Sequence, residues 1–110
     1  MTVKGTKLSM VRGDSESITV TCSDPFVTGD AVTFTVRESP EDPIVLQKVV
    51  TDFPNGEAII GIDPADTAGL DFGDYVYDIQ LTRTGGVVTT LIEPDKFKIR
   101  EEVTYGWRLP

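Results

Sequence analysis

The stretch "GLDFGDYVYDIQLTR", residues 69–83, decides the fold class. From Tyr75 onward a large apolar residue recurs at every second position, which is the pattern of a β-strand with one buried face. The residues expected to point inward are Tyr75, Tyr77, Ile79 and Leu81. No window has the apolar spacing of a standard helix, so we expect an all-β fold built around this strand.

Other segments of the chain also carry strand patterns. Three of them alternate as regularly as the first, and they are residues 16–22, 31–38 and 95–102. Three less regular segments and one weaker N-terminal segment are also interpreted as strands. They are residues 44–51, 56–62 and 86–93, and Lys4 to Met10.

Turn signals separate these segments. Asn55-Gly56 is a strong reversal signal, and the pair Gly85-Gly86 suits a short hairpin that needs positive φ. Turns recur about every eight to twelve residues, as in all-β sandwiches. We therefore predict about seven to eight antiparallel strands packed as a β-sandwich.

One short helical turn is expected within residues 63–70. Asp63 can cap it, Pro64 fits its first turn, and Gly69 can end it. Directly after this turn, Leu70, Gly73 and Tyr75 have the spacing of a tyrosine corner. In that device a tyrosine hydroxyl returns to a nearby backbone group and fixes a crossover between sheets.

The tripeptide Arg12-Gly13-Asp14 matches the motif that many adhesion ligands present to integrins. An integrin ligand would show it at the tip of a protruding loop. Here it lies between two predicted strands, where Gly13 would permit a tight reversal and Asp14 could accept hydrogen bonds from the amides of Ser15 or Glu16. We therefore interpret Arg12, Gly13 and Asp14 as a structural turn.

Composition excludes several chemistries. The chain has no histidine and a single cysteine, Cys22, so a histidine base, an internal disulfide and a multi-cysteine zinc site cannot form. Eighteen acidic residues against ten scattered basic ones give a net charge of −8. Nucleic acid and anionic membranes are therefore not expected partners. We expect no enzyme activity, no catalytic residues and no cofactor.

Two kinds of binding site would use residues that could also have purely structural roles. Asp63, Asp66, Asp71 and Asp74 could offer oxygen ligands to calcium, but they lack the spacing of an EF-hand loop, and turn chemistry is favoured over a metal site. Carbohydrate binding would need aromatic residues on loops. The loop aromatics are Phe26, Phe53 and Phe72, and each could equally fill an end of the sandwich.

The final residues break the strand pattern and carry the single tryptophan. We expect a sandwich domain over residues 1–104 and a C-terminal tail over residues 105–110. Tyr105, Trp107 and Arg108 form a possible interface, because tryptophan and arginine are enriched at interface centres. The N-terminus shows neither a signal-peptide apolar segment nor a cleavage site, so synthesis in the cytoplasm is expected.

These features together resemble a known group of proteins. The Arg12–Asp14 turn, the segment "DPADTAGLDFGDYVYDIQLTRTGGVVTTL" and the following "FKIREEVT" are similar to immunoglobulin-like modules of tailed bacteriophages and prophages. They are also similar to the N-terminal domain of upper baseplate proteins from phages of Gram-positive bacteria, and the resemblance covers about Met10 to Thr104. Family members often continue into fibre segments, whereas this sequence stops after the sandwich.

The resemblance implies an immunoglobulin-like β-sandwich that serves as a virion structural protein in a tail, baseplate or related assembly. Its expected partners are other phage structural proteins and further copies of itself, since virion assemblies are symmetric. The expected location is the virion, after synthesis in the bacterial host cytoplasm. The alternative is a carbohydrate- or host-receptor-binding β-sandwich module.

Overall fold

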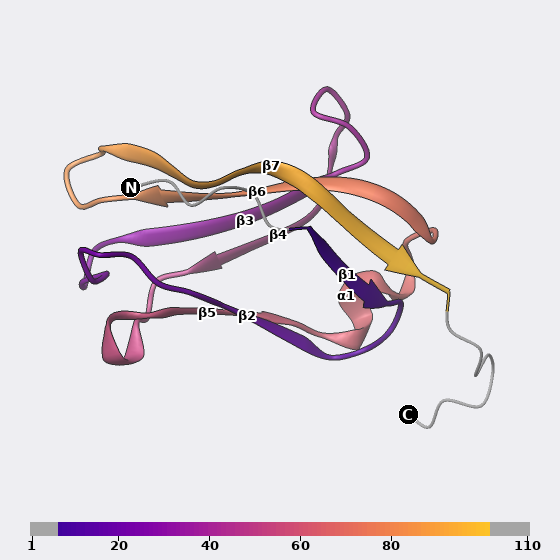
Figure 1. The fold of residues 1–110 in the computed structure, drawn as a ribbon. Coiled ribbons are helices and arrows are strands. Elements are labelled where there is room, and N and C mark those ends of the chain that lie inside the picture. The colour runs from indigo at the N-terminus through magenta and orange to yellow at the C-terminus, as the bar shows by residue number, and fades with distance from the viewer. Residues whose placement is uncertain (1–6, 102–110) are drawn as a thin grey trace.

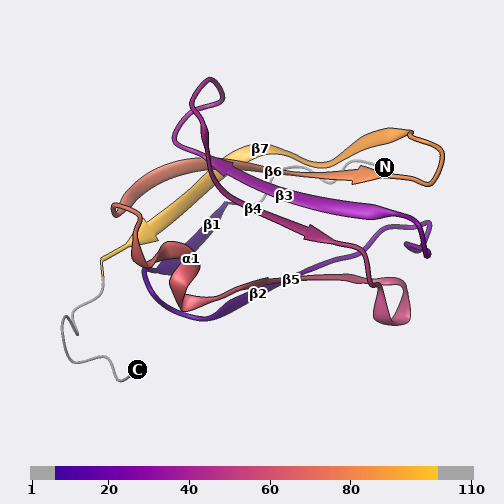
Figure 2. The ribbon, with the colours of Figure 1, turned by 180° about the vertical axis from the view of Figure 1, so that it is seen from behind.

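The computed structural model describes residues 7–101. Two β-sheets stack on each other, with a short helix at one end and a long hairpin at the other (Figures 1 and 2). The elements in chain order are β1 (Leu8–Val11), β2 (Glu16–Val20), β3 (Ala31–Arg37), β4 (Ile44–Val50), the 3-10 turn η1 (Pro54–Gly56), β5 (Ala58–Ile62), α1 (Pro64–Ala68), β6 (Gly73–Thr82) and β7 (Val88–Arg100).

One sheet has five strands in the order β1-β7-β6-β3-β4, and the other pairs β2 with β5. In the larger sheet, β3 and β4 are consecutive in the chain, as are β6 and β7, whereas β1 beside β7 and β6 beside β3 come from distant parts of the chain. The chain crosses between the two sheets on entering and leaving β2 and β5. Together with the seven strands of the described residues, this arrangement is an immunoglobulin-like β-sandwich, as the sequence predicts. Residues 7–101 contain no helix long and apolar enough to cross a membrane.

The core lies between the two sheets and confirms the predicted faces. The four inward residues of β6 are all buried, as are Val32, Phe34 and Val36 of β3. The rings of Phe34, Tyr77 and Phe97 form a cluster with centroid separations of 5.6 to 6.4 Å. Such tilted and edge-to-face contacts add to the stabilisation from burial.

The C-terminal strand differs from the prediction. Residues 86–93 and 95–102 were expected to form two strands, but β7 is continuous through Pro94. Its register with β6 shifts around Asp78, where Tyr77 pairs with Asp95 and Ile79 pairs with Ile92. This bulge accommodates Pro94, which has no N–H to donate to the ladder.

One strand pairing and one turn also differ from the expectation of antiparallel strands joined by hairpins. β1 runs parallel to β7, with Leu8 opposite Phe97. Asn55 and Gly56 take positive φ angles of 57° and 73°, as a reversal requires, but their turn carries the chain from one sheet to the other. The hairpin at Gly85 and Gly86 forms as predicted, with φ angles of 99° and 95°.

Candidate protein interface

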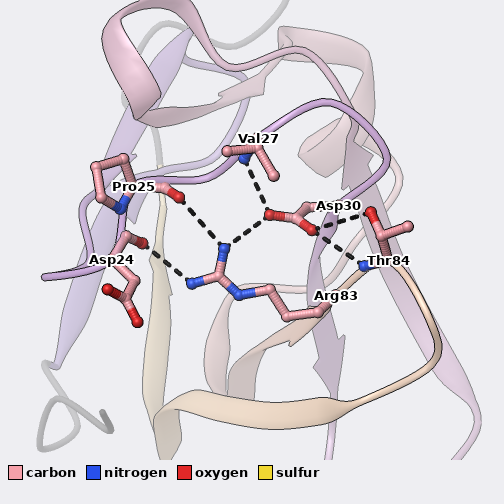
Figure 3. Close-up of polar contacts among 6 residues, drawn as sticks. All are labelled: Asp24, Pro25, Val27, Asp30, Arg83 and Thr84. Atoms are coloured by element: carbon pink, nitrogen blue, oxygen red, sulfur yellow. Dashed lines mark hydrogen bonds and ion pairs between the residues drawn. The ribbon is translucent and has the colours of Figure 1, made fainter.

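A polar clamp joins two loops at the end of the sandwich that lies away from α1. Asp30 is only 1% exposed, and its carboxylate accepts hydrogen bonds from the amides of Val27 at 3.0 Å and Thr84 at 3.1 Å (Figure 3). The Arg83 guanidinium forms an ion pair with the same carboxylate at 2.8 Å. The β2–β3 connection is thereby fixed to the β6–β7 hairpin.

Arg83 extends the clamp further along the β2–β3 connection. Its guanidinium also donates to the backbone carbonyls of Asp24 at 3.1 Å and Pro25 at 3.3 Å (Figure 3). The same group lies 5.9 Å from the ring centroid of Phe26. A planar guanidinium can serve several acceptors at fixed angles, which a lysine cannot do.

A third loop, the β4–β5 connection, joins this end through Phe26. The buried Phe26 ring packs on Phe53 with centroids 5.2 Å apart, and the Phe26 amide donates to the Gly56 carbonyl at 3.2 Å. Three connections therefore form one body, which we call the clamped loop end. Interfaces that are already ordered before binding lose less conformational entropy on association.

The clamped loop end presents apolar side chains to solvent. Val27 is 56% exposed, and Val87 and Val88 on the hairpin are 64% and 58% exposed. These three valines lie on two loops that the clamp joins, and exposed apolar area of this kind can be buried by a partner. The sequence analysis did not predict this site, because the pairing of Asp30 with Arg83 joins positions that are far apart in the chain.

Acid should weaken the clamp. The pKa of the Asp30 carboxyl lies below its ordinary value of 3.8, mainly because the Val27 amide donates a hydrogen bond to it. Burial raises this pKa, whereas the Thr84 amide and Arg83 lower it further. The unfolded chain therefore binds a proton more readily than the folded one. Stability from this group is present above about pH 4 and is lost as the pH falls through the folded pKa.

Urea unfolding followed across the acid range measures this effect. The unfolding midpoint should fall as the pH drops below about 4, and an Asp30→Asn variant should show a shallower fall. The pKa of Asp66 is also lowered: burial raises it, but the hydrogen bond and charge of Lys48, together with the Asp63 amide, lower it by more. Part of the acid dependence should therefore remain in the Asp30→Asn variant. Equal slopes for the two proteins would show that the Asp30 charge does not stabilise the fold.

The Arg12-Gly13-Asp14 turn lies at the opposite end of the sandwich and is docked on its neighbours. Gly13 is buried with φ 84°, and its amide donates to Thr67 Oγ1 of α1 at 2.8 Å. The Arg12 guanidinium donates to the Leu70 carbonyl at 3.1 Å. The tripeptide is therefore part of the framework rather than the tip of a protruding loop.

Asp14 has a smaller role than the sequence suggests. Its amide closes the turn on the Val11 carbonyl at 3.1 Å. Within residues 7–101 its carboxylate accepts no hydrogen bond, so the bonds expected from Ser15 and Glu16 are not formed. Gly13 and Arg12 carry the contacts of this turn.

The residues predicted as a tyrosine corner meet just after α1. The Tyr75 hydroxyl donates to the Asp71 carbonyl at 2.7 Å, which is the return bond of that device. Gly73 begins β6 with φ 144°, and Leu70 packs against the core. Burial, followed by the charges of Glu38 and Asp71, raises the pKa of Tyr75 above 10.0, so the hydroxyl remains a donor at neutral pH.

The acidic residues around α1 serve the local backbone. Asp66 accepts the Asp63 amide at 2.7 Å, as in a capping box, and forms an ion pair with Lys48 at 2.8 Å. Asp63 and Asp66 therefore cap the start of α1. No group of three or more metal-ligating side chains gathers within residues 7–101.

The loop aromatics are mostly engaged inside the molecule. Phe26 and Phe53 pack on each other at the clamped loop end. Phe72 is 53% exposed, but the Arg12 guanidinium lies 5.5 Å from its ring centroid. Cys22 is half-buried against the core. Tyr105, Trp107 and Arg108 lie outside the described residues.

No protein-family model matches the chain, and a search of curated proteins finds no match. Among solved structures it is similar to the extracellular domain of the voltage-gated sodium channel β4 subunit, described as forming parallel homodimers that explain a role in cell–cell adhesion. That match covers 94% of this chain and 97% of the other, at 13% identity and a TM-score of 0.47. Likeness at this level does not extend to function.

Proposed function

We propose that this chain is a non-catalytic structural component of a phage or prophage virion, in a tail, baseplate or related assembly. It acts by association with other virion proteins and with copies of itself. The context rests on the sequence resemblance of residues 10–104 to phage immunoglobulin-like modules.

The clamped loop end is the observation that carries the associative role. Asp30 and Arg83 hold it in one conformation, and Val27, Val87 and Val88 are exposed on it. Apolar area that is already ordered can be buried against a partner with little further loss of chain entropy.

Carbohydrate or host-receptor binding is less well supported. Sugar-binding sandwiches need exposed aromatic faces, whereas Phe26 and Phe53 stack on each other and Arg12 lies over Phe72. Virion assembly needs no such platform. Association through the clamped loop end is therefore the preferred function.

The role of this surface can be tested by incorporation into particles. A tagged chain carrying Val27→Asp and Val87→Asp, expressed in the phage-producing host, should be largely lost from purified particles. Charged side chains at these positions would have to be desolvated on association. Both side chains are exposed, so the variant should fold, as circular dichroism would check.

A matched control carries Ser17→Asp and Thr19→Asp. These side chains are exposed on β2, on the outer face of the two-stranded sheet, and the net charge changes by the same amount. The control should enter particles like the unmodified tagged chain. Equal incorporation of both variants would show that the clamped loop end is not the contact surface.

A further inference from the structure

The outer face of the five-stranded sheet carries a pocket of about 120 Å³. It lies between the β3–β4 loop and the bulge of β7, with walls formed by Pro40, Val76 and Pro94. Arg37 and Asp78 supply its charged groups. Sites for drug-sized ligands span about 300–1,000 Å³, so this pocket fits a single side chain better than a whole small molecule.

Asp78 is the group in this pocket that has no hydrogen-bond or ion-pair partner within residues 7–101. Its carboxylate is half-buried. Burial raises its pKa, while the charge of Arg37 acts in the opposite direction. The Arg37 guanidinium itself donates to the Asp42 carbonyl at 2.6 Å. A desolvated carboxylate without a donor favours a cationic partner group.

The same face carries a basic stripe on β7. Lys96, Lys98 and Arg100 alternate outward and are exposed. Across residues 7–101 none of these three side chains forms an ion pair. Lys96 lies directly opposite Val76 on β6, two positions before Asp78. A chain of net charge −8 thus has unpaired positive and negative groups side by side on one face.

We infer that a second copy of this chain packs on this face, with Lys96 of each copy bound in the Asp78 pocket of the other. The two copies would be related by a twofold axis that runs across the strands at Tyr77. This axis brings the level of Val76 and Lys96 in one copy opposite the level of Asp78 in the other. Both Lys96–Asp78 contacts then form at once, as an isologous interface requires. The aliphatic stem of each lysine lies against Val76 and the two prolines, and its ammonium group reaches the carboxylate.

This inference rests on the proposed function, since it names the surface through which copies of the chain associate. Sedimentation velocity of the full 110-residue chain over a concentration series, in about 0.15 M salt to screen long-range repulsion, should show a reversible dimer. Lys96→Asp alone and Asp78→Lys alone should each raise the dissociation constant by about tenfold or more. Asp78→Asn, which disturbs the pocket least, should weaken the dimer in the same direction.

The decisive experiment mixes the Lys96→Asp chain with the Asp78→Lys chain. Each contact in the mixed dimer again joins a lysine to an aspartate, so the mixture should recover a dissociation constant close to that of the wild type. Controls carrying Ser17→Asp with Thr19→Asp, or Ser17→Lys with Thr19→Lys, match the charge changes away from this face and should leave the dimer intact.

A monomeric wild-type chain at all concentrations, charge-reversed chains that dimerise like the wild type, or a mixture that does not recover would each overturn the inference. The proposed function fails separately, if the chain is absent from virions. A chain found in particles that shows no Lys96–Asp78 coupling would retain the proposed function and lose this interface.

Discussion

Replacing Arg83 by methionine should lower the free energy of unfolding by about 3 kcal/mol. Methionine keeps much of the apolar stem and removes the guanidinium, so Asp30 would remain buried without its ionic partner. Removing one partner of a buried pair costs roughly 3–5 kcal/mol. The lower value is expected because the Arg83 side chain is 26% exposed and water can enter.

Arg83→Lys is the matched control. Lysine restores a positive charge near Asp30, but it cannot reach the carbonyls of Asp24 and Pro25 with the same fixed fork. Its stability should fall between those of the wild type and Arg83→Met in equilibrium urea unfolding. A methionine variant within about 0.5 kcal/mol of the wild type would mean that the clamp contributes little to the fold.

Replacing Gly13 by valine should also cost about 3 kcal/mol. A β-carbon at φ 84° costs about 1–2 kcal/mol, and a branched side chain at a buried site adds about 1–3 kcal/mol from overpacking. The turn would also be drawn away from Thr67, weakening the contact between β1 and α1. Thermal or urea unfolding measures the loss.

Asp14→Ala tests which residues of the tripeptide stabilise the turn. Because the Asp14 carboxylate accepts no hydrogen bond within residues 7–101, this change should be close to neutral, within about 0.5 kcal/mol. Gly61→Ala is a control for glycine replacement in general, since a β-carbon there meets no atom within 4 Å. If Asp14→Ala destabilises as much as Gly13→Val, the assignment of this turn's contacts to Gly13 and Arg12 is wrong.

The sequence predicted those parts of the fold that depend on neighbouring residues. Apolar and polar residues alternate along β3 and β6 because one face of each strand is buried, so the sequence of a single strand is enough to reveal the pattern. The helical turn after Asp63 and the spacing from Leu70 to Tyr75 are also local. The β2–β3 and β6–β7 loops could be placed approximately for the same reason.

The remaining features depend on residues that are far apart in the chain. Asp30 and Arg83 are separated by 53 positions, and nothing near either one indicates the pairing. The parallel alignment of β1 with β7 and the bulge opposite Asp78 arise from how the sheets close. Asn55-Gly56 can form the same turn in a hairpin within one sheet or in a connection between two sheets. The Asn-Gly pair therefore does not predict which of the two forms.

We propose that this chain is built into virions as a structural component. The most direct measurement is quantitative mass spectrometry of density-purified particles from the host that encodes it. We predict that the chain is present at a fixed ratio to other virion proteins and stays with the particles through a salt wash. A chain that is expressed but remains entirely in the particle-free fraction would contradict the claim.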